Sequence, residues 1–269
     1  MPPTISFLSD YGHEDDFVGV CHGVMARIAP EARVIDVTHG IPRHNVRAGA
    51  LVLRNALPYM PAGVHLAIVD PEVGAERRAV AIRCAEDDRI LVGPDNGVLS
   101  LAVERFGGAV EAVDVGRSTW RLEPVSATFH GRDIFAPVAA RLAAGGPLAE
   151  AGEPCDSDSL ARIELPTPHA ADGALTAHAL AVDRFGNVIL DATHEDLDGS
   201  GIKLGRPLEL EVGPQRFTAW YAVTFADVRA GELLVYEDAY RTLAVAVNRG
   251  DAAQLLGLQA GGELRIAAA

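Results

Sequence analysis

Cysteine is scarce in this sequence, and long apolar runs are missing. Its 269 residues hold three cysteines, Cys21, Cys84 and Cys155, which form no CxxC pair and leave one unpaired in any disulfide scheme. We therefore expect a reducing, cytoplasmic location. No run approaches the ~18 apolar residues of a membrane-spanning helix. Residues 1–10 lack the basic-then-apolar order of a signal peptide. We expect neither a membrane span nor a secretion signal.

Positive charge is also in short supply. Lys and Arg total 23 against 37 for Asp and Glu, which gives a net charge of −14. A surface this acidic argues against binding to nucleic acid or to an anionic membrane, because both repel it. Hydrophobic residues make up 49% and charged residues 22% of the chain. That balance is typical of a globular protein and excludes extended disorder.

Several common catalytic and binding motifs are absent. No GxGxxG or Walker loop follows a predicted strand, so neither dinucleotide nor ATP phosphate binding is indicated. No GxSxG elbow occurs, which disfavours a serine hydrolase. No HxH or HExxH spacing occurs, so a histidine-rich zinc site has little support, and we assign no metal ligand among the candidate site residues.

The first part of the chain alternates short apolar runs with helical patterns. We predict strands at 4–8, 32–37, 64–69, 79–82 and 90–92. Helical spacing marks 17–30, 46–56, 98–106 and 134–143. Strand, loop and helix repeated with short connections predict an α/β domain with a largely parallel central sheet.

A looser stretch rich in Pro, Ser and Asp separates this part from a β-rich remainder. Short alternating runs occur at 175–183, 186–192, 208–212, 217–223, 232–237 and 242–248. Their spacing suits a small barrel or sandwich. We therefore divide the chain into an N-terminal α/β domain at 1–155, a linker at 156–173 and a smaller all-β domain at 174–269.

Acidic side chains crowd the turn after the first predicted strand. Asp10, Asp15 and Asp16 lie in the segment SDYGHEDD. Three carboxylates in one turn can bind a hard cation, or accept hydrogen bonds from the vicinal hydroxyls of a ribose. They can equally cap the helix that follows. The spacing alone leaves these alternatives open.

Another acidic residue, Asp70, follows the third predicted strand. Arg77 and Arg78 stand where the next strand begins, so at most one of them turns toward Asp70. Such a pair would fix an ionised carboxylate in a closed site, or form a surface salt bridge of little consequence. His130, in TFHGRDIFAP, precedes a helical run and is either structural or catalytic.

The β-rich part contains polar residues near predicted turns. In DRFGNV, Asp183 and Asn187 flank a hairpin signal. Tyr236 and Asn248 flank a strand-like run. An Asn side chain can pair with a purine edge, and aromatic rings can enclose it.

These segments occur together in a recognisable order. They are SDYGHEDDFVG, DVTHGIP, VDPEVGAERR, GPDNGVLS, TFHGRDIFAP, DRFGNV and AVNRG. From about residue 4 to 255 the chain resembles the SAM hydroxide adenosyltransferases, which are adenosine-forming S-adenosyl-L-methionine (SAM) hydrolases. This family is related to the fluorinases and chlorinases.

The resemblance implies an N-terminal α/β domain joined to a C-terminal β-barrel, assembled as a homotrimer with sites at subunit interfaces. It implies that water attacks the ribose C5′ of SAM in line and gives adenosine and methionine, without a cofactor. The family's catalytic Asp–Arg–His set falls on Asp70, Arg77 and His130. The halogenase branch has Tyr where this chain has Asp70, so we expect the hydroxide branch.

The same matching implies further substrate contacts. Asp10 is expected to bind the ribose hydroxyls, Asp183 the methionine ammonium, and Asn187 the adenine, with Asn248 close to it. The remaining substrate-binding candidates are Asp15, Phe129, Gly131, Phe185 and Tyr236. This chain departs from the expected pattern at four places. It has His44 where the fluorinase has Trp, Gly131 where the fluorinase has Ser, and Glu72 where Gly is usual. It also has Ala239–Tyr240 in the turn that is Ser-rich in the family.

Two alternative functions are compatible with the motifs. A non-catalytic SAM or adenosine sensor could retain the same residues. A nucleoside hydrolase would use an Asp-rich first turn to hold calcium, although Leu8 stands where its first Asp would be expected.

Overall fold

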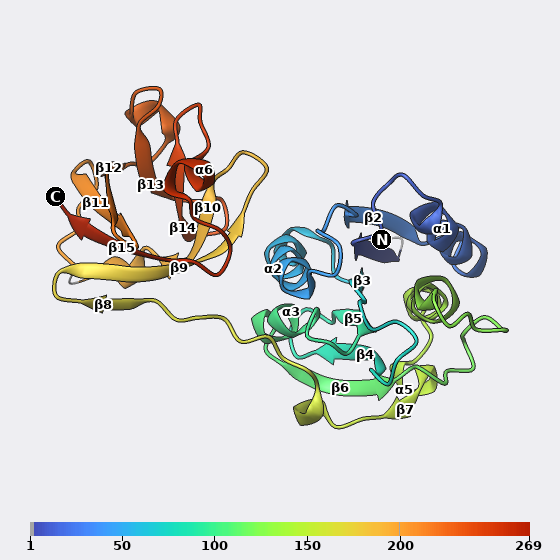
Figure 1. The fold of residues 1–269 in the computed structure, drawn as a ribbon. Helices are drawn as coiled ribbons and strands as arrows, with labels where there is room; N and C mark the ends of the chain where they lie inside the picture. The colour runs from blue at the N-terminus through green and yellow to red at the C-terminus, as the bar shows by residue number, and fades with distance from the viewer. Residues whose placement is uncertain (1–2, 199) are drawn as a thin grey trace. The chain divides into compact units, whose positions relative to one another are not determined.

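The structure is a computed structural model that describes residues 3–198 and 200–269. It contains two compact units, Met1–Ile163 and Glu164–Ala269, each with its own hydrophobic core (Figure 1). The division falls inside the stretch predicted as a linker. Within that stretch, the backbone N–H groups of Ala161 and Ile163 donate to side chains of the first unit. His169–Ala171 forms a strand of the second unit.

The first unit is a mixed seven-stranded sheet with a parallel centre, as predicted. Its strands are β1 (Thr4–Ser9), β2 (Arg33–Thr38), β3 (Val64–Ile68), β4 (Ala79–Cys84), β5 (Ile90–Pro94), β6 (Ala109–Asp114) and β7 (Glu153–Pro154). They are ordered β2-β1-β3-β5-β4-β6-β7. The first four in this order are mutually parallel, whereas β4 runs antiparallel to β5 and to β6.

Helices cover both faces of this sheet. They are α1 (Phe17–Ile28), α2 (Val46–Ala56), α3 (Ser100–Arg105), α4 (Ala136–Ala143) and α5 (Leu148–Ala151). Ile5 and Phe7 of β1 pack with α1 and α4, while Leu8 packs with α2 and α3. Burial on both faces explains why β1 reads as a continuous apolar run rather than an alternating one.

The helix predicted at 134–143 begins earlier and with a different turn. A π-helical segment, Gly131–Phe135, leads into α4, and Pro137 lies in the first turn of α4. Proline is tolerated there because first-turn N–H groups have no partner within the helix. The change of helical register before Pro137 therefore lets the helix start at Gly131, next to His130.

The second unit is a closed β-barrel. Its strands are β8 (His169–Ala171), β9 (Ala174–Val182), β10 (Val188–Thr193), β11 (Pro207–Val212), β12 (Gln215–Tyr221), β13 (Leu233–Glu237), β14 (Thr242–Val247) and β15 (Glu263–Ala268). The order β10-β14-β13-β12-β11-β15-β9 is closed by pairing of β9 with β10, and β8 adds to β9. This closure decides for the barrel over the sandwich. A short helix, α6 (Ala252–Leu256), packs against the core.

No helix within the described residues combines the length and the apolar character needed to span a lipid bilayer.

A neutral histidine is buried in the first sheet. His65 is 0% exposed, with Nδ1 2.7 Å from Ser6 Oγ and Nε2 3.0 Å from Arg89 Nη1. A guanidinium can only donate, so Nε2 accepts and Nδ1 carries the proton. Burial, together with the charge of Arg89, lowers the pKa of His65 to about 3.

This histidine should make the fold sensitive to mild acid. In the unfolded chain the pKa of His65 returns to about 6.5. Between that value and about 3, the unfolded chain binds a proton that the folded chain does not. The free energy of unfolding should therefore decrease as the pH is lowered through this range, by up to about 1.4 kcal/mol per pH unit. Urea unfolding across this range should show a steeper pH dependence for the native protein than for His65→Gln, and equal slopes would contradict the assignment.

Candidate active site

A buried ion pair joins the end of β3 to the start of β4. Arg77 Nε donates to Asp70 Oδ1 at 2.8 Å, and Arg77 Nη2 donates to Asp70 Oδ2. The Asp70 and Arg77 side chains are 6% and 5% exposed. The pair is therefore not the surface salt bridge that the sequence left open. Two parallel hydrogen bonds fix the plane of the carboxylate as well as its charge.

The neighbouring arginine points elsewhere. Arg78 Nε donates to Asp95 Oδ2 at 2.8 Å, and its guanidinium also reaches Ser159. Only one of the two consecutive arginines therefore faces Asp70, as the alternation of side chains predicts.

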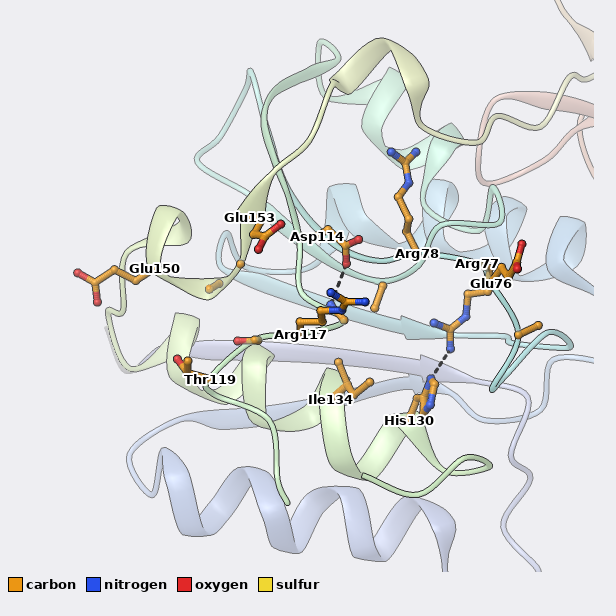
Figure 2. A pocket seen from close by; sticks show the side chains of 16 residues that line it. Glu76, Arg77, Arg78, Asp114, Arg117, Thr119, His130, Ile134, Glu150 and Glu153 are labelled. Atoms are coloured by element: carbon orange, nitrogen blue, oxygen red, sulfur yellow. Dashed lines mark hydrogen bonds between the residues drawn. The ribbon is translucent and has the colours of Figure 1, made fainter. Parts of the chain in front are cut away.

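His130 adjoins the same guanidinium. Its Nδ1 lies 2.9 Å from Arg77 Nη2 (Figure 2). Because the guanidinium only donates, Nδ1 accepts, and the neutral ring carries its proton on Nε2. Burial and the charge of Arg77 both lower the pKa of His130. The ring is thus a neutral hydrogen-bond donor through Nε2.

A cavity of about 680 Å³ opens beside this group. Arg77 and His130 line one end of it (Figure 2). Polar side chains of both signs line the remainder, among them Asp114, Arg117 and Glu153. Asp70 is not among its lining residues, nor are the other candidates from the first unit, which are Asp10, Asp15, Phe129 and Gly131.

Asp10 follows β1 and lies at the same sheet edge as Asp70, because its N–H bonds to Ile68 at the end of β3. Its Oδ2 accepts a hydrogen bond of 2.9 Å from the N–H of His44. His44, at the position where the sequence comparison expects Trp in a fluorinase, therefore holds Asp10 through its backbone N–H.

The other two carboxylates of the turn do not join Asp10. Asp15 is exposed, and Asp16 stands at the N-cap of α1 without a side-chain capping bond. Within the described residues these three side chains form no convergent cation cluster.

Sequence reasoning missed Tyr11. A Cβ built on Gly131 would collide with the Tyr11 hydroxyl, and the Tyr11 ring lies 6.0 Å from that of Phe129. Burial raises the pKa of Tyr11 well above its usual value, and Cys21, Asp70 and Asp10 add to the effect. The phenol is therefore a protonated donor, placed in the space that glycine leaves free. The only signal in the sequence was Gly131 itself, where the fluorinase has a larger residue.

In the second unit, Asp183 organises the hairpin between β9 and β10. Its Oδ1 accepts from the N–H groups of Phe185 and Asn187 at 2.8 and 2.9 Å, and its Oδ2 accepts from Asn187 Nδ2 at 2.7 Å. The predicted hairpin is confirmed by the pairing of the two strands. Phe185 is left 70% exposed at its tip.

Tyr236 lies near this hairpin, on β13. Its ring is 5.1 Å from that of Phe225. Burial, with Asp183 and Asp238 nearby, raises the pKa of Tyr236 to about 12. Asn248 Nδ2 donates one hydrogen to the carbonyl of Val228 at 2.8 Å, which leaves its second N–H and its amide oxygen able to meet a ligand.

Comparison with known families matches both units. The sequence profile of the SAM hydroxide adenosyltransferase N-terminal domain matches residues 5–152. That of the SAM hydroxide adenosyltransferase C-terminal domain matches residues 177–265.

Individual relatives are similar along the whole chain. An (R)-S-adenosyl-L-methionine hydrolase of Salinispora tropica is 50% identical over 266 residues, which cover 99% of this chain and 98% of the relative. A fluorinase of Actinoplanes is 30% identical and covers 96% of this chain and 95% of its own. The crystal structure of a conserved protein from Thermotoga maritima, 36% identical, superposes with a TM-score of 0.91 over 98% of this chain and 99% of its own. The chain belongs to the SAM hydroxide adenosyltransferase family.

Proposed function

We propose that this protein hydrolyses SAM to adenosine and L-methionine. The observation that carries the proposal is the buried Asp70–Arg77–His130 group, which holds a carboxylate where the halogenase branch has a phenol. The relative that is 50% identical is named an (R)-S-adenosyl-L-methionine hydrolase, which agrees with this chemistry.

The reaction needs a nucleophile more than an acid. The C5′–S bond breaks with its electron pair going to sulfur, and methionine leaves as a neutral thioether that needs no proton. Water forms the new C–O bond and must then lose a proton. A carboxylate with a pKa of ~3.9 is a poor base for free water, with a pKa of ~15.7. The proton therefore moves to Asp70 late, once bonding to carbon has acidified the water.

The hydrogen bonds of Arg77 give its two partners, Asp70 and His130, different roles toward the water. Each oxygen of Asp70 receives one hydrogen bond from Arg77, and a carboxylate oxygen can accept a second one from water. His130 has its Nδ1 occupied by Arg77, so it can only donate to the water through Nε2. We therefore assign to His130 the orientation of the water, and to Asp70 the uptake of the proton.

Substrate contacts are proposed from the same residues that the sequence indicated. The ribose hydroxyls fit Asp10, whose Oδ2 is already held by His44. The methionine ammonium fits Asp183, because its carboxylate has lone pairs beyond the three bonds of the loop. Asn187 and Asn248 are assigned to the adenine, with Phe129, Phe185 and Tyr236 as apolar walls.

We also propose that the chain forms a homotrimer with active sites at subunit interfaces. The match of both units to the domains of one family supports this proposal. Light scattering in solution should give three times the 28.4 kDa of one chain.

A reducing cytoplasm suits the cysteines, which are all free, and cell fractionation tests that location. The proposed reaction uses SAM as substrate and water as nucleophile, and it requires no cofactor.

Purified protein incubated with SAM should release adenosine and methionine in equal amounts. The result should hold in excess chloride, because the Asp70 oxygens accept hydrogen bonds, which water can donate and a halide cannot. Liquid chromatography with mass spectrometry distinguishes adenosine from chloroadenosine. SAM bound but unconsumed would indicate a sensor instead, and a halogenated product would overturn the branch assignment.

Replacing the carboxylate should separate turnover from binding. Asp70→Asn keeps the shape but removes the proton acceptor, so kcat should fall roughly 10²- to 10⁴-fold while the dissociation constant for SAM changes little. Single-turnover kinetics and calorimetry measure the two quantities. Asp95→Asn, which breaks the neighbouring pair with Arg78, is the matched control and should retain kcat. Equal losses in turnover and binding by Asp70→Asn would refute its role.

Removing the Tyr11 hydroxyl should slow the reaction modestly. Tyr11→Phe deletes one hydrogen-bond donor from the space beside Gly131 and keeps the ring that packs near Phe129. A single neutral hydrogen bond corresponds to a decrease in kcat/KM of about 2- to 10-fold. Tyr59→Phe, on an exposed surface, serves as the control. Unchanged kcat/KM in Tyr11→Phe would show that the hydroxyl only fills space.

A further inference from the structure

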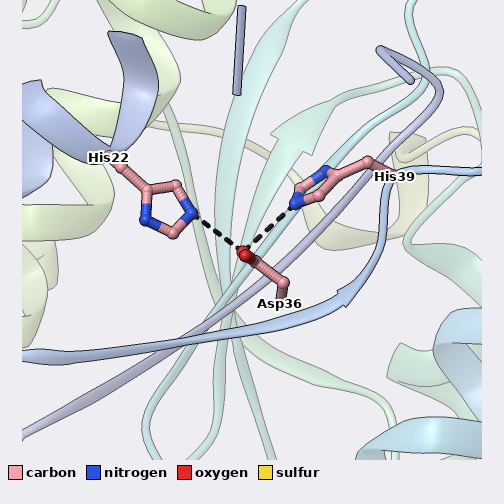
Figure 3. Close-up of side chains that lie close together, drawn as sticks. All are labelled: His22, Asp36 and His39. Atoms are coloured by element: carbon pink, nitrogen blue, oxygen red, sulfur yellow. Dashed lines mark hydrogen bonds and ion pairs between the residues drawn. The ribbon is translucent and has the colours of Figure 1, made fainter. Parts of the chain in front are cut away.

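We propose that His22, Asp36 and His39 form a binding site for one divalent transition-metal ion, with zinc as the reference ion. The residues come from α1, from β2 and from the loop after β2, and their side chains converge (Figure 3). His22 Nε2 lies 2.9 Å from Asp36 Oδ1, and His39 Nε2 lies 3.1 Å from the same oxygen. One ligand atom from each residue lies within 4.8 Å of the other two.

His39 supplies an independent reason to expect a ligand. Its side chain is 0% exposed, and its Nε2 makes no hydrogen bond of acceptable geometry, although Asp36 Oδ1 lies 3.1 Å away. A buried polar nitrogen is rarely left without such a bond. The orphaned nitrogen points toward Asp36 (Figure 3). A cation held by both groups would satisfy it.

The second nitrogen of His39 is already arranged as in metal sites. Its Nδ1 lies 2.7 Å from Ser9 Oγ. When Nδ1–H donates to that hydroxyl, the lone pair of Nε2 faces Asp36. Metal-bound histidines commonly have their other ring nitrogen fixed by such a partner, which sets the tautomer and the ring orientation.

The distances suit a first-row ion. Zinc bonds to imidazole nitrogen and carboxylate oxygen at about 2.0 to 2.2 Å, so two ligand atoms on one ion lie about 3.0 Å apart at 90° and about 3.4 Å apart at 109°. The two N···O distances, 2.9 and 3.1 Å, require only a small outward movement. Two imidazoles and one carboxylate favour zinc, cobalt or nickel over magnesium or calcium, which prefer oxygen ligands.

The site is anchored on one side and open on the other. His39 is fully buried, whereas the His22 and Asp36 side chains are 35% and 40% exposed. Water can therefore complete the coordination. The His13 ring, 5.3 Å from that of His39, stands nearby on an exposed turn.

The site adjoins, but does not include, the group proposed for hydrolysis. The carbonyl of His39 accepts from the N–H of Gly12 at 2.8 Å, and Ser9 immediately precedes Asp10. A bound ion would thus brace the turn that carries Asp10. The proposed reaction at Asp70 does not route through it, so chelator should leave hydrolysis in place.

The proposal is tested with the metals alone on the full chain, freed of metal beforehand. Zinc titrated by calorimetry, and cobalt followed by its visible absorption, should each bind at one equivalent per chain. His22→Gln and Asp36→Asn alter exposed side chains outside the proposed reaction group, and each should weaken binding roughly tenfold to a hundredfold or more. Circular dichroism verifies that both variants fold.

The matched control is His178→Gln in the barrel. His178 also pairs with a carboxylate, Asp191, at 2.7 Å, with Glu263 at 3.8 Å, and its loss should leave the affinity unchanged. Native protein that binds neither metal, or affinity that is equal in the native protein and in His22→Gln, would overturn the proposal. A loss caused by His178→Gln alone would place the metal in the barrel and overturn it as well.

Discussion

The bidentate ion pair between Asp70 and Arg77 is the interaction on which the proposed chemistry depends. Its two side chains are almost fully buried, and buried charges are tolerated when they are paired and hydrogen-bonded. Two parallel hydrogen bonds from Arg77 fix the plane of the carboxylate. The same guanidinium also determines which nitrogen of His130 carries the proton. In the proposed mechanism, one side chain therefore positions both groups that act on the water.

Sheet topology explains why this pair forms. In the order β3-β5-β4, the chain leaving β3 must pass the carboxyl end of β5 before it enters antiparallel β4. Residues 70–78 thus run along the edge where open α/β sheets place their ligands. The two arginines find carboxylates at the ends of two different strands, Asp70 after β3 and Asp95 after β5. The β4–β5 hairpin therefore positions the arginine as well as extending the sheet.

Local patterns predicted the fold better than the site. Most of the strands and α2 at Val46–Ala56 follow from apolar runs and turns, because burial acts within each element. The strands β6 and β15 were not predicted. Contacts between distant segments leave no such pattern. Tyr11 meets Gly131 across the sheet edge, and no spacing rule connects residues so far apart. His22, Asp36 and His39 match no short metal motif, since three separate segments supply them. The π-helical turn at Gly131–Phe135 begins before the predicted helix at 134–143, because a change of helical register leaves no periodic pattern in the sequence.

The identity of the nucleophile follows from what surrounds Asp70. A halide has no proton to lose, so it needs hydrogen-bond donors around it and gains nothing from an acceptor. Water needs an acceptor, because once its oxygen has bonded to carbon it must lose a proton. Arg77 pairs with Asp70 but leaves the carboxylate oxygens able to accept further hydrogen bonds. In the proposed reaction, a paired carboxylate in place of the phenol expected for the halogenase branch replaces a donor with an acceptor and so favours water.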